Sequence, residues 1–180
     1  MKKRQVDHIL RAAGDITGDN QFVIVGSQAL HGKYPDLADA IFVSAEVDLI
    51  AKNKPQTTEL LNSIGQESLF HETYGVYADP VDEKTATLPV GWQGRLVNLP
   101  EGDTNGVRGL CLEPHDLAIS KYVAWREKDQ VFTRELVKRK LLSKAKLLTL
   151  VSATPVPEQV RKLLRERIER DFQDGLGKPR

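Results

Sequence analysis

The sequence predicts an α/β protein in which a mixed sheet flanked by helices is followed by a C-terminal helical region. Up to about residue 112, short apolar runs are separated by Gly, Pro and Asp, a pattern typical of strands in antiparallel or mixed pairing. After Pro114 the apolar residues recur at helical spacing. We therefore expect an α/β core at residues 1–112 and a helical region at 113–180 packed on it, because no long linker separates them.

The first fifty residues predict a helix, two strands and the turns between them. Residues 3–13 carry apolar side chains at helical spacing, and the stretch GDITGDNQ at 14–21 is a cluster of turn-forming residues. The run FVIV at 22–25 is wholly apolar and predicts a buried strand. It leads into GSQALHG, where a short helix is expected, and residues 45–50 predict the second strand.

The middle of the chain predicts one helix and several short strands. Pro55 suits the first turn of a helix, and Gly65 suits its end. The pieces that follow are short, contain β-branched or aromatic residues and are bounded by turn formers. Four such β-like pieces occupy residues 72–78, 84–88, 94–100 and 107–113.

The C-terminal third predicts helices. Pro114 suits a first helical turn, and the negative charge of Asp116 is favourable near a helix start. The helical pattern runs to about residue 142 with a break near Lys128, and a short helix or an extended link follows. A closing helix covers residues 154–172, before a loose tail. Its expected buried face consists of Val160, Leu163, Leu164 and Ile168.

Composition excludes several classes of protein. The 180 residues are 40% hydrophobic and 28% charged, which argues against a disordered chain and against a coiled coil. No apolar run is long enough to span a membrane, and the N-terminus lacks the apolar stretch of a signal peptide, so we expect a cytoplasmic protein without a membrane partner. With Cys111 as the one cysteine, an intrachain disulfide framework and a cysteine-based zinc cluster are excluded.

The charge is unevenly distributed along the chain. Residues 1–90 carry 8 Lys/Arg and 13 Asp/Glu, whereas residues 91–180 carry 18 and 12. An acidic half and a basic half suit an anionic substrate that a cation bridges to the protein. The alternative is that the two halves neutralise each other across an interface.

The stretch SAEVDLI contains the most informative pair of residues. Glu46 and Asp48 alternate with apolar neighbours in the predicted strand, so both carboxylates point to the same face. Carboxylate oxygens are ligands for Mg²⁺ or Mn²⁺, and a cation would offset the repulsion between the two charges. The alternative is the solvent-exposed polar face of an edge strand.

Gly26 and Ser27 form a second candidate site, between a buried strand and a helix. Glycine lets a phosphate approach the backbone, the helix start presents free N–H groups, and the Ser27 hydroxyl adds a donor. The alternative is that Gly-Ser merely caps the helix.

Together these features resemble the nucleotidyltransferase superfold of DNA polymerase β-like and minimal nucleotidyltransferases. The shared pattern is an apolar strand, Gly followed by Gly or Ser, a spacer, and acid–hydrophobic–acid. A later segment is similar to a motif of the AbiEii-like group, which includes toxins of toxin–antitoxin pairs and uncharacterised members. The matching residues are Asp116, Leu117, Lys121, Ala124, Arg126, Lys128 and Asp129.

The resemblance implies a role for each candidate residue in Mg-dependent transfer of a nucleoside monophosphate from a nucleoside triphosphate to an acceptor hydroxyl. Glu46 and Asp48 would bind the metal and be catalytic, and Lys121 would neutralise charge on the phosphates. Gly26 and Ser27 would hold the triphosphate. The remaining expected contributors are Arg126 and Lys128, as nucleotide-binding cations, and Asp116 and Asp129, as auxiliary residues. The alternative for this charged set is an exposed helix with salt bridges.

Two departures from the family pattern matter. The spacer between Ser27 and Glu46 has 18 residues, and its insertion at 34–44 would gate the site or shape its specificity. The third carboxylate of the superfold has no obvious counterpart. The candidates are Asn98, Asp79 and Asp82. With only two acids, catalysis could still run on one ion, or the chain would be a non-catalytic member that binds a nucleotide or a partner protein or is purely structural.

The acceptor is suggested only by charge and by the resemblance. Six basic residues with one acid, Glu135, among them would follow an RNA backbone, which fits a tRNA acceptor. A protein acceptor or a cognate antitoxin-like partner are further implications of the resemblance, and a solvated helix face is the alternative. The six residues, called here the basic run, are Arg134, Lys138, Arg139, Lys140, Lys144 and Lys146.

Overall fold

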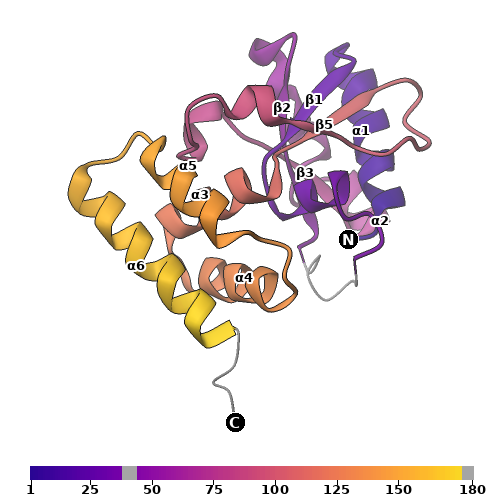
Figure 1. Cartoon of the computed structure of the whole chain (residues 1–180). Coiled ribbons are helices and arrows are strands. Elements are labelled where there is room, and N and C mark those ends of the chain that lie inside the picture. Colours follow the sequence, from indigo (N-terminus) through magenta and orange to yellow (C-terminus); the bar gives the residue numbers. More distant parts are fainter. Residues whose placement is uncertain (38–43, 176–180) are drawn as a thin grey trace. The chain divides into compact units, whose positions relative to one another are not determined.

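The computed structural model describes residues 1–37 and 44–175 (Figure 1). The insertion at 34–44 falls largely outside the described residues, as does most of the expected tail. By internal packing the chain forms two compact units. Unit 1 consists of Met1–Thr85 and Arg95–Glu113, and unit 2 of Ala86–Gly94 and Pro114–Arg180. The domain boundary expected at residue 112 stays a prediction.

Unit 1 contains a mixed five-stranded sheet with the order β3-β2-β1-β5-β4. Strands β1 and β5 pair in parallel, as do β2 and β3, while β1 with β2 and β4 with β5 are antiparallel. The predicted α/β class with a mixed sheet is therefore confirmed. The strand bounds are β1 (Gln21–Ile24), β2 (Glu46–Ala51), β3 (Tyr77–Pro80), β4 (Val97–Asn98) and β5 (Arg108–Cys111).

Helix α1 (Lys3–Thr17) packs its apolar stripe against the rest of unit 1, since Val6, Ile9 and Leu10 are fully buried. The helix extends four residues beyond the predicted end, into the expected turn cluster. It ends at Gly18, whose φ of 65° is in the left-handed region that closes helices, and the Gly18 N–H donates to the Gly14 carbonyl. The predicted turn is therefore present, but it begins at Gly18, the last glycine of the stretch 14–21.

The other helical segments of unit 1 are short. Two strand predictions were wrong here. Residues 72–74 close helix α2, because the Ser68 hydroxyl caps its start and Gly75 adopts a left-handed conformation at its end. Residues 84–88 form no strand, because the Asp82 carboxylate accepts the Lys84 N–H and bends the chain into a turn. The bounds are η1 (Ser27–Gly32), η3 (Pro55–Ile64), α2 (Leu69–Tyr74) and η4 (Glu83–Thr85), with η denoting 3₁₀-helices. A further 3₁₀-helix, η5 (Trp92–Arg95), falls in unit 2 except for its last residue.

Unit 2 is helical, as predicted for the C-terminal region. The long helical pattern breaks at Trp125, whose φ is 53°, slightly before the predicted point. On the last helix, Leu164 and Ile168 are fully buried, but Leu163 is 41% exposed, so its predicted burial was wrong. None of the described helices is long and apolar enough to cross a membrane. The helices are α3 (Pro114–Ala124), α4 (Glu127–Lys138), α5 (Lys144–Ser152) and α6 (Glu158–Gly175).

The carboxylate of Asp19 ties the start of β1 to the turn after β2. It accepts backbone N–H bonds from Gln21 at 3.0 Å, Asn53 at 2.7 Å and Lys54 at 2.8 Å, and Asp19 is only 3% exposed. Burial acts to raise the pKa of Asp19, but the hydrogen bonds to its charged form outweigh it and hold the pKa below the usual range.

Replacing this carboxylate should reduce stability in a pH-dependent way. Because the folded pKa is depressed, the stabilisation is complete above the unfolded pKa of about 3.9 and is lost as pH falls through the folded value. We expect Asp19→Asn to lower the free energy of unfolding by about 1–3 kcal/mol at pH 7, and by less near pH 3. Urea unfolding at both pH values measures this, with the exposed Asp36→Asn as control. An equal loss at both pH values would contradict the explanation.

Candidate metal and nucleotide site

The two acids of β2 lie on one face of the sheet. Val47 and Leu49 are fully buried, while Glu46 and Asp48, which alternate with them, are partly exposed. Since side chains alternate along a strand, both carboxylates point away from the face that buries the valine and the leucine. The predicted alternation of SAEVDLI is thus confirmed.

The Asp48 carboxylate lies directly against Gly26. The antiparallel pairing of β1 and β2 continues past β1, where the Val25 N–H donates to the Asp48 carbonyl at 3.2 Å. A Cβ atom at Gly26 would be 1.6 Å from Oδ2 of Asp48 and 2.6 Å from its Cγ. Gly26 is in an extended conformation, with φ of −91°, so the glycine is required by space and not by backbone angle. Gly26 of the Gly-Ser turn and Asp48 of the acid strand are therefore in direct contact.

A third carboxylate lies beside this pair, on β3. Strands β2 and β3 are parallel, and their register places Asp79 opposite Asp48 and Tyr77 opposite Glu46. Registered neighbours share a sheet face and are about 5 Å apart. The Tyr77 hydroxyl donates a hydrogen bond to Oε2 of Glu46 at 3.0 Å, which confirms that the side chains of this pair meet.

The electrostatics of this face show an excess of negative charge. Burial and then the negative charge of Glu46 raise the pKa of Asp79 above its usual range. Among the described residues, however, no group of three His, Cys, Asp or Glu side chains is arranged so that it could hold a metal ion. The carboxylates are neighbours that supply oxygen ligands of the kind Mg²⁺ prefers, without forming a ready three-ligand site.

The structure does not bring Asn98 to the acid pair. Asn98 is exposed on β4 at the edge of the sheet, and β5 and β1 separate β4 from β2. With strands about 4.8 Å apart, the backbones of β4 and β2 are about 14 Å from each other. Asp82, the other candidate, is exposed in the turn after β3.

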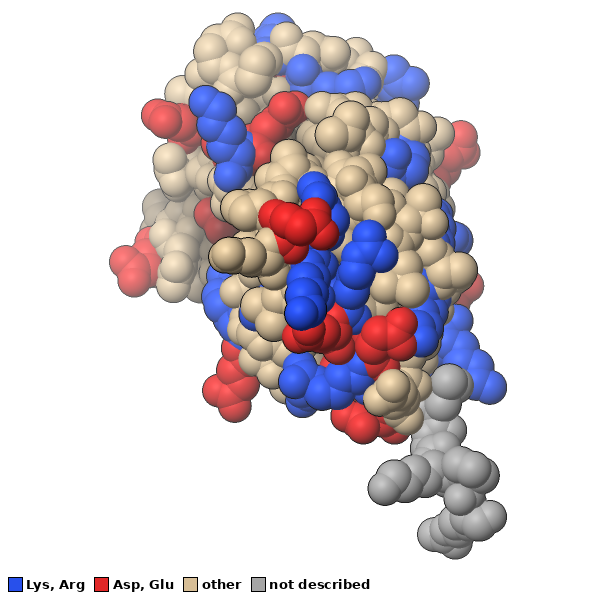
Figure 2. Space-filling view, turned by 60° about the vertical axis from the view of Figure 1, so that its left-hand side comes forward, with Lys and Arg blue, Asp and Glu red and all other residues tan. Residues whose placement is uncertain are grey.

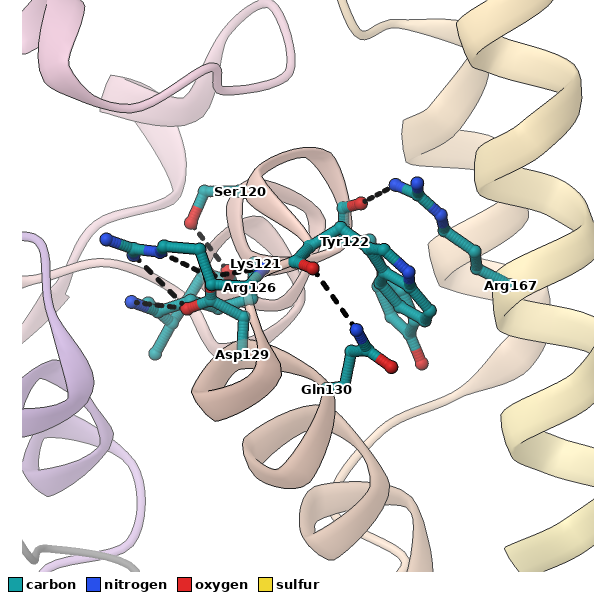
Figure 3. A network of polar contacts seen from close by, with 9 residues as sticks. Ser120, Lys121, Tyr122, Arg126, Asp129, Gln130 and Arg167 are labelled. Atoms are coloured by element: carbon teal, nitrogen blue, oxygen red, sulfur yellow. Dashed lines mark hydrogen bonds and ion pairs between the residues drawn. The ribbon is translucent and has the colours of Figure 1, made fainter.

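In unit 2, Asp129 is the centre of a polar network at the break between α3 and α4 (Figure 3). The Asp129 side chain is 2% exposed. Its carboxylate accepts hydrogen bonds from the Nε–H of Arg126 at 2.7 Å and from the backbone N–H of Arg126 at 3.1 Å. It also lies 3.5 Å from Nζ of Lys121. Burial acts to raise the pKa of Asp129, but the hydrogen bond from Arg126 and the charge of Lys121 outweigh it and hold the pKa below its usual range. Asp129 thus fixes two cations next to each other.

A family model described as "Nucleotidyltransferase of unknown function (DUF6036)" matches residues 4–172, which include both the acid pair and the Asp129 network. The chain belongs to this family. No match is found among the curated proteins or among the solved structures. The expected relation to nucleotidyltransferases is therefore confirmed at the level of the family, while the AbiEii-like subgroup stays a prediction.

The other candidate residues of this DUF6036 protein have varied surroundings. Ser27 is partly exposed at the start of η1, and Lys128 is exposed in the first turn of α4. Asp116 is fully buried in the first turn of α3. Unit 1 therefore contains the Gly-Ser turn and the acids of β2 and β3, and unit 2 contains the candidate cations with Asp116 and Asp129.

Three residues of the basic run of the DUF6036 protein pair with acids of unit 2. Arg134 pairs with Asp171, Arg139 with Glu135, and Lys144 with Glu169. Figure 2 shows a face on which Lys and Arg side chains are interspersed with Asp and Glu side chains. The pairs of Arg139 and Lys144 support the solvated-face alternative for these two residues, whereas Arg134 pairs with the fully buried Asp171.

Sequence reasoning missed Tyr77 in this DUF6036 protein, although a signal was present. In VYADP the polar residues Tyr77 and Asp79 are two apart, which is the same spacing as Glu46 and Asp48. Two strands with polar residues at i and i+2 place four such side chains on one face if the strands pair in register. That register depends on which strands pair in the folded protein. The sequence therefore shows the spacing of the polar residues on β3 but not that β3 pairs with β2.

Proposed function

We propose that this DUF6036 protein is a Mg²⁺- or Mn²⁺-dependent nucleotidyltransferase that moves a nucleoside monophosphate from a nucleoside triphosphate to an acceptor hydroxyl. The observation that carries the proposal is the contact of the Asp48 carboxylate with Gly26, with Asp79 as its registered neighbour. Through this contact, the Gly-Ser turn lies next to the carboxylates of β2 and β3. When bound, the cation would neutralise these acids and polarise the phosphate that is attacked.

The residues of unit 1 have complementary roles in this proposal. Gly26 leaves room for the Asp48 carboxylate beside the backbone, and the Ser27 hydroxyl offers a donor to a phosphate. Glu46, Asp48 and Asp79 supply oxygen ligands from two adjacent strands. We assign the role of the third carboxylate to Asp79 rather than to Asn98, because Asp79 lies opposite Asp48 on the strand that pairs with β2.

Unit 2 offers a pair of cations of the kind that bind phosphate groups. Lys121 and Arg126 are held beside each other by Asp129, so their donors are oriented before a ligand arrives. Lys128 is an exposed additional cation. Asp116 is fully buried and would act on the arrangement of α3 rather than on the substrate. The acceptor, whether a tRNA or a protein, and an antitoxin-like partner remain part of the proposal.

Metal binding tests the proposal directly. We expect wild-type protein to bind Mn²⁺, and nucleoside triphosphates only with a divalent cation, in calorimetry with ATP, CTP, GTP and UTP. Asp48→Asn and Asp79→Asn should each weaken Mn²⁺ binding at least about 10-fold, since even removal of an outer hydrogen-bond partner of a metal ligand has an effect of that size. The exposed Asp82→Asn should bind as wild type does.

The same variants separate a ligand from a structural acid. Burial and the charge of Glu46 both make the ionised form of Asp79 unfavourable. Asp79→Asn should therefore weaken Mn²⁺ binding but leave the free energy of unfolding unchanged or raise it. Nucleotide binding that does not depend on a cation would contradict the proposed enzymatic activity and support a non-catalytic nucleotide-binding protein. The absence of a group of three metal-binding side chains among the described residues favours that alternative. Transfer of labelled nucleotide into total tRNA would test that acceptor.

A further inference from the structure

The hydroxyl of Tyr77 fixes the orientation of the Glu46 carboxylate. The parallel register of β2 and β3 makes the two residues neighbours, and the phenol donates to Oε2 of Glu46 at 3.0 Å. A carboxylate on a strand face otherwise rotates about its side-chain bonds, and a hydrogen bond to one oxygen restricts that rotation. The second oxygen then has a defined position.

The tyrosine ring is itself held in place. The ring of His71 packs against the ring of Tyr77 with centroids 4.6 Å apart and an interplanar angle of 55°. His71 is oriented in turn, because its Nδ1 accepts the backbone N–H of Glu67 at 3.1 Å. A chain of contacts from α2 through His71 therefore sets the position of the Tyr77 hydroxyl.

The hydroxyl is the donor in this hydrogen bond and the Glu46 carboxylate is the acceptor. Carboxylates that bind metals are typically fixed by such outer hydrogen bonds.

We propose that Tyr77 is a positioning residue that orients Glu46 for a divalent cation, without contacting the substrate itself. This inference rests on the proposed function, since it assumes that Glu46 is a metal ligand. It adds a residue from β3, and through His71 the short helix α2, to the structure that supports the site. The residue that touches the cation would be Glu46, and Tyr77 would act through it.

Mn²⁺ binding by the full chain, measured by calorimetry and by the loss of the free-ion electron paramagnetic resonance signal, tests this role. Tyr77→Phe keeps the ring against His71 and removes only the hydroxyl, and it should weaken Mn²⁺ binding 10- to 100-fold. Tyr74→Phe is the matched control, because Tyr74 is a 51% exposed tyrosine at the end of α2. It should bind Mn²⁺ as wild type does.

A double-mutant cycle separates positioning from a general loss of structure. In the Glu46→Gln background, Tyr77→Phe should cause no further loss of Mn²⁺ affinity, because the carboxylate on which it acts is gone. An equal loss in both backgrounds, or unchanged binding by Tyr77→Phe in the wild-type background, would overturn the inference and leave the proposed function intact. A wild-type protein that binds no Mn²⁺ would overturn both.

Discussion

Gly26→Ala is expected to eliminate cation-dependent nucleotide binding. The new methyl group would occupy a point 1.6 Å from Oδ2 and 2.6 Å from Cγ of Asp48, so the carboxylate must leave its position. We expect Mn²⁺ affinity to fall at least as far as in Asp48→Asn, and the free energy of unfolding to fall by about 1–3 kcal/mol from overpacking. Calorimetry and urea unfolding measure the two effects.

Two further variants isolate the contact between Gly26 and Asp48. In the Asp48→Ala background, Gly26→Ala should cost little stability, because the nearest remaining atom, Cβ of residue 48, is 3.3 Å away and only a small shift is needed. Gly94→Ala is the control glycine substitution, since a Cβ there meets nothing within 4 Å. If Gly26→Ala bound Mn²⁺ normally, the proposed role of this contact in metal binding would be disproved.

Asp171→Ala is expected to have the largest effect on stability among the substitutions considered. The Asp171 side chain is fully buried on α6 and accepts hydrogen bonds from the hydroxyls of Tyr122 at 3.1 Å and Thr133 at 3.2 Å, beside Nε of Arg134 at 3.4 Å. Its removal leaves two buried hydroxyls without this acceptor and one cation without its partner. The expected loss in the free energy of unfolding is about 3–5 kcal/mol.

Tryptophan fluorescence is a suitable measurement for this effect. Both tryptophans, Trp92 and Trp125, belong to unit 2, which also contains Asp171. Asp174→Ala, at an exposed position on the same helix, should unfold at the wild-type urea concentration. A shift of the Asp171→Ala transition no larger than that of this control would show that the buried network adds nothing to stability.

Local patterns explain why much of the fold could be predicted. The alternation in SAEVDLI predicted which face each side chain of β2 takes, because a half-buried strand has a period of two. The apolar run 22–25 predicted β1, and Pro114 marked the start of α3. In each case the deciding physics acts within a few residues of chain.

The errors and omissions arose where the deciding contact is distant or competes with a local signal. Asp79 becomes the neighbour of Asp48 through the parallel register of β3, which the 30 residues between them in the sequence do not specify. The contact of Gly26 with Asp48 depends on the antiparallel pairing of β1 and β2. Residues 72–74 had strand-forming composition, yet the Ser68 cap and the Gly75 turn favoured a helix.

The path of the chain between the two units limits how the protein can be dissected. The chain enters unit 2 for nine residues at Ala86–Gly94, returns to unit 1, and leaves it again after Glu113. A fragment that stops at residue 113 would retain Leu88 and Trp92, which are buried in the whole chain, without the helices of their own unit. A fragment that starts at residue 114 would lack this segment altogether. Rearranged chains, with 1–85 joined to 95–113 for unit 1 and 86–94 joined to 114–180 for unit 2, are the rational way to obtain either unit alone.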